Sequence, residues 1–302
     1  MAEKAIVLGA SGDQGIPLVS RLLDAGFSVT AGTRRDDALA NTPFSDLATV
    51  AADLLDQASL EEAFKGQDVL AMHLPFEHDF AKAEAFGRNI ANAAKAAGLK
   101  KIVFNSSCYV ADRDLEISAH DGRRSIQNSI VVSGINHVFI EPVVFMNNMI
   151  APWCKPSIVR HDVFAYPASP DLKISFISLD DVAQTMVAAL QTDKVDRQHV
   201  AVGGPEALTG SEVAQKLSVA AGRPIKFQSL APDEFAMNIS ELVTGKREIP
   251  KGSVYDGMAR FYRFYNEQDI SPLDVAPESW ITKLPVQLTT FENWAGQQDW
   301  SK

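Results

Sequence analysis

The sequence predicts an α/β fold in which a parallel sheet is covered by helices on both faces. Short apolar runs alternate with helical patterns through the first half of the 302-residue chain. A glycine-rich loop separates the first apolar run from the first helix, and the later runs have the spacing of strand–helix–strand units. Such crossovers make the strands parallel and collect their carboxyl ends at one edge, where α/β proteins bind nucleotides.

The elements of the first half follow one another without long interruption. Lys4–Leu8 is a short apolar run typical of a strand, and residues 16–25 repeat apolar side chains at helical spacing until Gly26. Ser59 with Glu62 has the form of a capping box. The other predicted strands are 28–32, 49–51, 68–74, 101–105 and 137–140, and the other predicted helices are 59–65, 80–97 and 121–133.

The second half shows a looser pattern, with four prolines between positions 150 and 171. The predicted strands there are 174–177 and 226–230, and the predicted helices are 182–190, 209–221, 254–265 and one that starts near 289. The candidate caps are Asp180 or Asp181, Thr209 with Glu212, and Thr289 with Glu292. We therefore expect a doubly wound Rossmann-type domain at residues 1–150, completed by residues 174–204, and a smaller mixed domain at 151–173 and 205–302 that covers the substrate.

Residues 9–15 read Gly-Ala-Ser-Gly-Asp-Gln-Gly, a GxxGxxG loop between a predicted strand and a predicted helix. In dinucleotide-binding folds one glycine permits the tight turn, one lets backbone approach a pyrophosphate, and one lets the helix pack on the strand. The helix N-terminus adds free N–H groups and the positive end of its dipole. The alternative is a glycine-rich turn that binds no ligand. The residues expected to bind the dinucleotide are Gly9, Ser11, Gly12, Asp13, Gln14 and Gly15.

Two arginines follow the second predicted strand, in the segment Thr33-Arg34-Arg35-Asp36-Asp37. Folds that prefer NAD place an acid near this point against the ribose 2′-hydroxyl, whereas guanidinium groups bind a 2′-phosphate. We therefore predict NADP(H) as the cofactor, bound by Thr33, Arg34 and Arg35, with Arg34 the stronger candidate. The alternatives are a solvated turn whose charges pair with each other and an acid role for Asp36 or Asp37.

Two more pairs of residues end predicted strands at the same edge. Asp53 and Leu54 follow the third strand, where this fold holds an adenine ring. The Asp53 carboxylate could accept a hydrogen bond from the amino group of that ring. A capping or surface role for Asp53 is an equal alternative. Leu74 and Pro75 end the fourth strand, where the chain passes the cofactor's ribose and diphosphate.

The chain resembles the NmrA-like family of atypical short-chain dehydrogenase/reductase proteins along nearly its whole length. The resemblance is carried by the GASGxxG loop, the strand that ends in Thr-Arg, and the segments AADLLDQASLEEAFKGQDVL, KKIVFNSS, SGINHVFIEPVVFMNNM, ISFISLDDVAQ and HVAVGGPEALTGSEVAQKL. It implies a Rossmann domain with a smaller substrate-covering part, and NADP(H) bound through the loop and Arg34. Members of the family include reductases of quinones, azo compounds, isoflavonoids and lignans, and redox-sensing regulators that bind nucleotide without turnover.

The catalytic region departs from the short-chain pattern, in which a Tyr-x-x-x-Lys motif supplies and tunes a proton donor. No lysine occurs between Lys101 and Lys155, and Tyr109, the tyrosine of that stretch, comes too early in the chain. The position that the family often fills with lysine falls on Arg123, a fixed cation that could hold ribose hydroxyls but could not transfer a proton at neutral pH. The alternative is a surface arginine. The family's usual Arg-Pro after the sixth strand is replaced by an acid, at Glu141.

Two further side chains are catalytic candidates. Ser107 follows the fifth strand, where its hydroxyl could bind a substrate carbonyl. His120 lies near the predicted pocket and could donate a proton. Cys108 beside Ser107 is expected to be a buried, inert thiol.

Composition excludes several classes of protein. The net charge of −10 gives no electrostatic reason to bind nucleic acid or an anionic membrane, and no uncharged apolar stretch has the length of a membrane helix. The six histidines show no metal-ligand spacing, and two cysteines make no disulfide framework. The spacing of the histidines therefore predicts no metal site. The start of the sequence shows no signal-peptide pattern, so we expect a cytoplasmic protein.

These observations favour an NADPH-dependent reductase of a small conjugated or aromatic electrophile, such as a quinone or an enone. Such an acceptor needs little help from a strong acid because its developing oxyanion is stabilised by conjugation. The alternative is an NADP(H)-binding redox sensor that acts through a regulatory protein partner. Homo-oligomerisation is compatible with either hypothesis.

Overall fold

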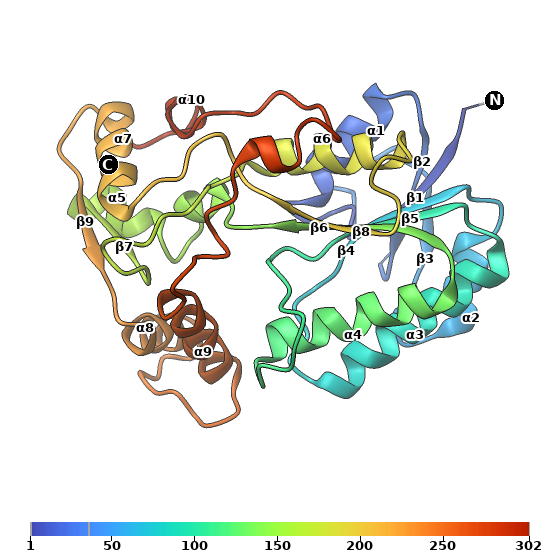
Figure 1. Ribbon diagram of the computed structural model, residues 1–302, viewed down its shortest axis with the longest axis horizontal. Coiled ribbons are helices and arrows are strands. Elements are labelled where there is room, and N and C mark those ends of the chain that lie inside the picture. Colours follow the sequence, from blue (N-terminus) through green and yellow to red (C-terminus); the bar gives the residue numbers. More distant parts are fainter. Residues whose placement is uncertain (1, 36, 302) are drawn as a thin grey trace. The chain divides into compact units, whose positions relative to one another are not determined.

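The protein is described by a computed structural model that covers residues 2–35 and 37–301 (Figure 1). The chain forms two compact units. Unit 1 comprises Met1–Pro142, Leu179–Ala201 and Trp280–Val286, and unit 2 comprises Val143–Ser178, Val202–Ser279 and Gln287–Lys302. The chain therefore returns to unit 1 twice, whereas the sequence predicted a single return.

Unit 1 is built on a seven-stranded sheet with the strand order β3-β2-β1-β4-β5-β6-β8. Its strands are β1 Lys4–Leu8, β2 Ser28–Thr33, β3 Thr49–Ala51, β4 Val69–His73, β5 Lys101–Asn105, β6 Asn136–Pro142 and β8 Gln198–Val202. Both β2 and β4 pair with β1 in parallel, so that Leu8 lies opposite Gly32 on one side and Met72 on the other. The strand order reverses between β1 and β4. The carboxyl ends of these strands therefore flank the switch point at which open α/β sheets bind ligands.

Helices cover both faces of this sheet. They are α1 Gly15–Asp24, α2 Gln57–Phe64, α3 Phe80–Ala97, α4 Ser118–Ser133 and α6 Leu179–Leu190. Helix α1 packs with α6, and α3 packs with both α2 and α4. Figure 1 shows α1 and α6 on one face of the sheet and α2, α3 and α4 on the other. The sheet is therefore doubly wound, which confirms the predicted fold class.

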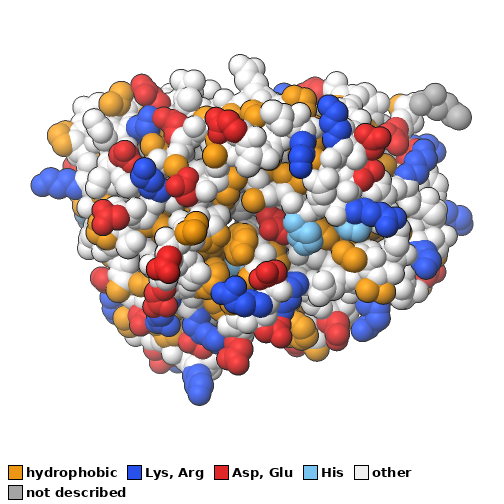
Figure 2. Space-filling view, in the orientation of Figure 1, with side chains coloured by type: hydrophobic (Ala, Val, Ile, Leu, Met, Phe, Trp, Pro, Cys, Tyr) orange, Lys and Arg blue, Asp and Glu red, His pale blue; other side chains and the backbone are white. Residues whose placement is uncertain are grey.

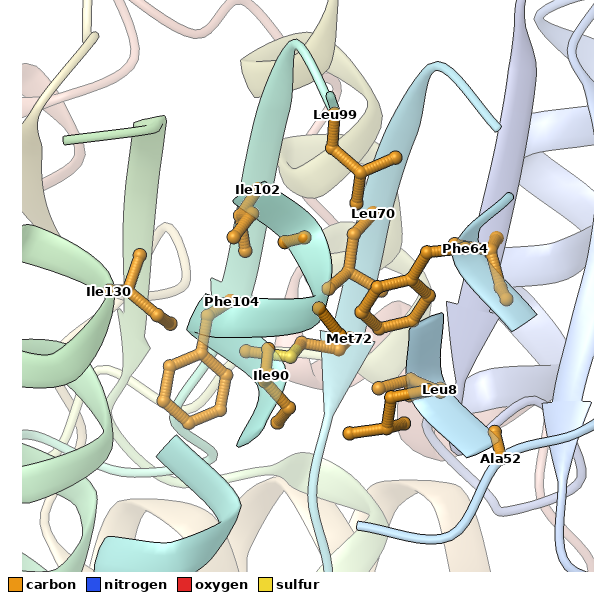
Figure 3. Packing of buried hydrophobic residues seen from close by; sticks show 14 of the residues in the cluster. Leu8, Ala52, Phe64, Leu70, Met72, Ile90, Leu99, Ile102, Phe104 and Ile130 are labelled. Carbon is orange, nitrogen blue, oxygen red and sulfur yellow. The ribbon is translucent and has the colours of Figure 1, made fainter. Parts of the chain in front are cut away.

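One buried cluster of unit 1 lies between the sheet and the layer of α2, α3 and α4 (Figure 3), and side chains of α1 and α6 are buried on the other face. Leu70 and Met72 of β4 and Phe104 of β5 supply the sheet side, and Phe64 and Ile90 supply the helix side. All five side chains are fully buried. Burial of side chains of this size contributes about 1.5–3 kcal/mol each, which holds the strand ends in fixed positions for a site.

Unit 2 is a mixed unit with a small sheet. Its elements are the 3₁₀ helix η1 Met146–Ile150, α5 Lys155–His161, β7 Val163–Tyr166, α7 Gly210–Ala221, β9 Lys226–Ser229, α8 Pro232–Thr244, α9 Val254–Asn266, the 3₁₀ helix η2 Pro277–Ser279 and α10 Phe291–Gly296. Strands β7 and β9 pair in parallel. The buried Tyr166 ring contacts an aromatic cluster made of Phe164, Phe176, Phe235 and Tyr262. Tyr262 belongs to α9, so this helix packs against the aromatic cluster of unit 2.

Some local expectations were wrong. Helix α2 begins at Gln57, because Asp56 rather than Ser59 is its N-cap and accepts hydrogen bonds from the backbone of Ala58 and Ser59. Residues 174–177 make two isolated bridges instead of a strand. Both errors have the same cause. Several residues in a short stretch can cap a helix or extend a strand, and tertiary contacts decide which of them does so.

Other caps show the same selection. Thr209 and Glu212 form the reciprocal capping box that the sequence predicted for α7. Helix α10 is instead capped by Thr290, one residue beyond the predicted Thr289. Asp180 lies inside α6, and its carboxylate accepts two hydrogen bonds from Arg21 of α1. That ion pair links the two helices on one face of the sheet.

Acidic and basic side chains are interspersed over the face drawn in Figure 2. Within the described ranges, no helix combines the length and the apolar character that crossing a bilayer requires.

Candidate functional site

A cleft of about 930 Å³ lies in unit 1 at the carboxyl ends of β1, β2 and β4. That volume is within the range typical of small-molecule and cofactor sites. The residues predicted from the sequence that line it are Gly9, Ser11, Gly12, Gln14, Thr33, Arg34, Arg35, Asp53, Leu54, Leu74, Pro75, Ser107 and Arg123. Three other predicted site residues lie outside the lining: Asp13, which is exposed, and Gly15 and His120, which are buried. The cleft therefore collects side chains that are spread over more than a hundred positions of sequence.

The three loop glycines stand in different surroundings. Gly9 has a φ of +89°, a left-handed conformation that glycine adopts at little cost. A β-carbon on Gly15 would lie 2.1 Å from the carbonyl oxygen of Gly9, so only glycine lets α1 approach β1 this closely. A β-carbon on Gly12 would meet nothing nearer than 3.4 Å. Packing within the protein thus requires glycine at positions 9 and 15, whereas a β-carbon on Gly12 would make only ordinary contacts with His73 and Gly9 at the lining of the cleft.

The N-terminus of α1 lies next to this loop without the usual side-chain cap. Gln14 is the N-cap residue, its side chain makes no capping hydrogen bond, and the first turn holds no acid. The Gln14 side-chain oxygen instead accepts from Asn105 Nδ2 at 2.8 Å and from Ser107 Oγ at 3.1 Å. The backbone N–H groups of Gly15 and Ile16 donate to the Gly12 carbonyl at 2.8 and 3.0 Å. The first turn of α1 thus has neither a side-chain cap nor an acid, and the positive end of its dipole favours an anionic ligand.

Ser107 is held firmly at the end of β5. Its backbone has a φ of 62°, which is unusual for a residue with a side chain. Its backbone N–H donates to Asn105 Oδ1 at 2.8 Å, and its hydroxyl is oriented by Gln14. Strained, over-determined positions of this kind are typical of functional sites.

The arginine pair after β2 lies at the other end of the cleft lining. Thr33 Oγ1 accepts from the backbone N–H of Arg35 and donates to the Arg35 carbonyl, which fixes the turn. Arg35 Nε lies 3.8 Å from Asp37 Oδ1. Arg34 has no ion-pair partner within residues 2–35 and 37–301, and Asp36, an alternative candidate, lies outside the described residues. Both arginines line the cleft, and among the described residues an ion-pair partner is found for Arg35 and not for Arg34.

Asp53 and Leu54 form a turn that is fixed by neighbouring elements. Asp53 Oδ1 accepts from the backbone N–H of Leu55 at 2.9 Å, and the backbone N–H of Asp53 donates to Ser59 Oγ at 3.1 Å. The buried Asn89 of α3 donates to the carbonyl of Leu54 at 2.9 Å. The Asp53 side chain is exposed and lines the cleft, so it combines the turn-forming role with access to a ligand.

Arg123 of α4 is a buried cation at the cleft. Its side chain is 5% exposed, and Nη2 donates to the carbonyl oxygen of Leu74 at 2.8 Å. The guanidinium lies 5.8 Å from the ring centroid of Phe76 and 6.0 Å from that of Phe104. No carboxylate in the described part of the chain forms an ion pair with it, and burial lowers the pKa of the guanidinium. A buried charge that has aromatic faces and one carbonyl but no counter-ion is prepared to bind negative charge.

The structure also reveals lining residues that sequence reasoning missed, above all His73. His73 ends β4, and burial together with the positive charge of Arg123 lowers its pKa to about 4. Its position directly before Leu74 and Pro75 was the available signal, because the same strand end was already assigned to the site. Lys82 at the start of α3 and the exposed ring of Phe76 also line the cleft.

His120 and Tyr109 lie together away from the cleft lining. Their ring centroids are 6.0 Å apart, and His120 is fully buried. Burial lowers the pKa of His120 to about 4, although Asp121 and a hydrogen bond with the backbone of Tyr109 act in the opposite direction. Burial also raises the pKa of the Cys108 thiol to about 12, which keeps it protonated. The proton-donor role proposed for His120 therefore stays a prediction, and His120 is not among the residues that line the cleft.

Glu141, which stands where the family usually has arginine, is buried in a hydrogen-bond network. Its carboxylate accepts from Gln127 Nε2 at 3.0 Å and from the backbone N–H of Val110 at 3.4 Å, and it lies 2.8 Å from Nδ1 of His199. It is not part of the cleft lining. The acid at this position therefore ties α4 and β8 to β6.

The fold and the glycine loop define an α/β protein of the NAD(P)-binding Rossmann class. The chain belongs to the NmrA-like family, whose sequence profile matches residues 1–295. Comparison thus confirms the family that the sequence segments indicated.

Three known proteins illustrate the likeness. The (4-alkanoyl-5-oxo-2,5-dihydrofuran-3-yl)methyl phosphate reductase of Streptomyces griseus is 31% identical over 232 residues, which are 76% of this chain and 77% of that protein. The NAD(P)H azoreductase of Xenophilus azovorans is 29% identical over 230 residues, which are 76% of this chain and 78% of that protein. The NADPH-dependent quinone oxidoreductase of Escherichia coli, solved with NADPH, has a TM-score of 0.79 and 21% identity over 96% of this chain and 98% of that one.

Proposed function

We propose that this protein is an NADPH-dependent reductase of a small conjugated electrophile. The observation that carries the proposal is the cleft itself, whose lining joins the glycine loop before the N-terminus of α1 to Arg34 and to the buried Arg123. Relatives that share three quarters of their length with this chain are named as reductases, one of them an NAD(P)H azoreductase.

The cofactor is NADP(H), and the residues present fit it. The backbone of Gly9 and Ser11, together with the positive end of the α1 dipole, would hold the diphosphate. Gly12 lines the same part of the cleft, and the absence of a side chain there would let the diphosphate approach the backbone, while its own N–H donates to the Gly9 carbonyl. The guanidinium of Arg34 would hold the 2′-phosphate, and Asp53 would border the adenine.

The chemistry that NADPH supplies when bound is a hydride. The protein itself would contribute mainly electrostatic stabilisation, because Arg123 would stabilise the negative charge that develops on the acceptor. Removal of one fixed donor to an oxyanion, in a site with little water, typically raises the activation free energy by about 2.7–4 kcal/mol. The guanidinium remains charged throughout, so it accepts and gives no proton.

Protonation of the product would come from Ser107 or from water. The hydroxyl of Ser107 donates to Gln14, so it would have to turn toward the product to give its proton and would regain one from solvent water. Ser107 would therefore relay a proton from water and is no strong acid. No tyrosine lies among the described residues that line the cleft. An acceptor whose reduced form is a stable oxyanion is therefore the class that suits this site, and an unactivated ketone is the class that suits it least.

Aromatic and aliphatic side chains at the cleft agree with a conjugated substrate. Phe76 and Phe86 line it together with Leu74 and Leu54. Flat apolar faces next to a buried cation favour an aromatic or conjugated ring that carries an oxygen or nitrogen acceptor. Quinones, enones and azo compounds share this chemistry.

The alternative function is an NADP(H)-binding redox sensor that acts through a protein partner. The missing Tyr/Lys pair is the observation that favours it. A sensor binds the same cofactor but does not consume it, so turnover separates the two functions.

The test follows NADPH absorbance while the purified protein meets a panel of quinones, enones and azo dyes, with NADPH binding measured in the same samples. Sustained consumption above the protein-free rate is expected, with the Gly12→Leu variant as the control that should bind no cofactor. Binding without consumption of NADPH for every acceptor would contradict the reductase and support the sensor.

A further inference from the structure

His73 packs its imidazole ring directly against the glycine loop. A β-carbon built on Gly9 would lie 2.6 Å from Cε1 and 2.8 Å from Nε2 of His73, and one built on Gly12 would lie 3.4 Å from Nε2. The Cε1–Nε2 edge of the ring therefore faces the two glycines at which a diphosphate would come closest to the backbone.

The two ring nitrogens of His73 have different surroundings. Nδ1 is buried and has no hydrogen-bond partner among the described residues, a costly state for a polar atom. The ring also lines the cleft, with Nε2 on the side of Gly12. Nε2 is therefore the nitrogen that a ligand at the glycine loop can reach, and it can carry an N–H in the neutral ring as well as in the charged ring.

One charged group acts on His73 from the elements packed around it. Gly9 and Gly12 of the loop and Asn105, which lies opposite His73 in β5, are uncharged. Arg123 of α4 is a cation, and its charge adds to burial in lowering the pKa of His73 to about 4. An anion placed at Nε2 would act in the opposite direction, because it favours the charged imidazolium.

We propose that His73 is a cofactor-binding residue, whose Nε2 donates a hydrogen bond to a phosphate oxygen of the dinucleotide at the glycine loop, and that the imidazole takes up a proton from the solvent as the phosphate binds. The inference rests on the proposed function only in that the cleft binds NADP(H). Protonation of His73 would make dinucleotide affinity depend on pH. Neither Arg34 nor the backbone N–H groups can supply this dependence, since they do not titrate near neutral pH.

The test is isothermal calorimetry with NADP⁺ on the wild type and on His73→Gln and His73→Ser. Glutamine places an amide N–H near the position of Nε2 but does not titrate, whereas serine removes the donor. Titrations at about pH 5.5 and 7.5 in buffers of different ionisation enthalpy give the number of protons taken up on binding. His78→Gln is the matched control, because His78 is exposed and outside the cleft lining.

At the lower pH, we expect NADP⁺ binding to take up more protons with the wild type than with His73→Gln. Protons taken up by NADP⁺ itself are the same in both titrations, so the difference belongs to His73. His73→Ser should weaken NADP⁺ by about tenfold or more, the value of a hydrogen bond to a charged group, while His78→Gln stays at wild-type affinity. Equal proton uptake in the wild type and His73→Gln, or full affinity in folded His73→Ser, would overturn the inference alone. No binding of NADP⁺ to the wild type at either pH would overturn the proposed function together with it.

Discussion

Gly15 lies against the backbone of Gly9, so closely that a β-carbon on Gly15 would stand 2.1 Å from the Gly9 carbonyl oxygen. The first turn of α1 and the end of β1 therefore meet through backbone atoms alone. This contact positions the N-terminus of α1 at the cleft, while Gly12 between them carries no comparable packing constraint. One loop thus separates glycines that serve the fold from a glycine that serves the site.

Substitutions in this loop should divide in the same way. Gly12→Leu should abolish NADPH binding with little change in unfolding temperature, because its side chain would enter the open space of the cleft. Gly15→Ala should lower the free energy of unfolding by about 1–3 kcal/mol, the usual cost of overpacking. Urea unfolding and NADPH fluorescence titration measure the two effects. Retained nucleotide affinity in Gly12→Leu would mean that the loop does not face the cofactor.

The arginine pair makes a second prediction. Arg34→Glu should weaken NADPH by about 10- to 100-fold and NADH much less, because the lost contact is a charge-assisted one to the 2′-phosphate. Arg35→Glu is the matched control and should have the smaller effect, since Arg35 faces Asp37. Dissociation constants for both nucleotides decide the matter. If Arg34→Glu weakens NADPH and NADH equally, Arg34 does not bind the 2′-phosphate.

Patterns that are local in the sequence predicted most of unit 1. The strands, the glycine loop and the arginine turn depend on neighbours within a few residues, and their meeting at one edge follows from parallel crossovers. Unit 2 was predicted in part. The strand β9 and the helices α7, α9 and α10 were expected, whereas β7, α5 and α8 were not. The pairing of β7 with β9 joins residues far apart in the chain, and no local signal marks such a pairing.

The site residues that sequence reasoning misplaced or missed depend on where a side chain points. His73 and His120 are both histidines near the expected edge, yet the end of β4 turns His73 into the cleft whereas α4 buries His120 beside Tyr109. Nothing in a single sequence fixes that difference, because it follows from the rotation of a helix and the alternation of a strand.

Burial of His120 predicts an acid-sensitive fold. The folded-state pKa is lowered to about 4 from the ordinary 6.5, so between these values the unfolded chain binds the proton more readily. The stabilisation is therefore fully present above pH 6.5 and is lost as the pH falls toward 4. For this residue the loss between about pH 7.5 and 5 is about 2 kcal/mol. Urea unfolding at both pH values should show a shallower dependence in His120→Gln than in the wild type, and equal slopes would contradict the assignment.

Arg123 makes the last prediction, in which activity and stability move differently. Arg123→Met removes a buried cation that has no carboxylate partner among the described residues, so the free energy of unfolding should stay the same or rise. The same change should lower kcat by about 10²-fold, because negative charge on the acceptor loses its counter-charge, while the Kd of NADPH changes little. Arg123→Lys should recover part of kcat, since it keeps a cation without the planar donors. An enone should suffer more than a quinone, whose ring already stabilises the oxyanion. Steady-state kinetics with both acceptors, beside urea unfolding, measure this split, and an unchanged kcat in Arg123→Met would show that the guanidinium serves the fold rather than the reaction.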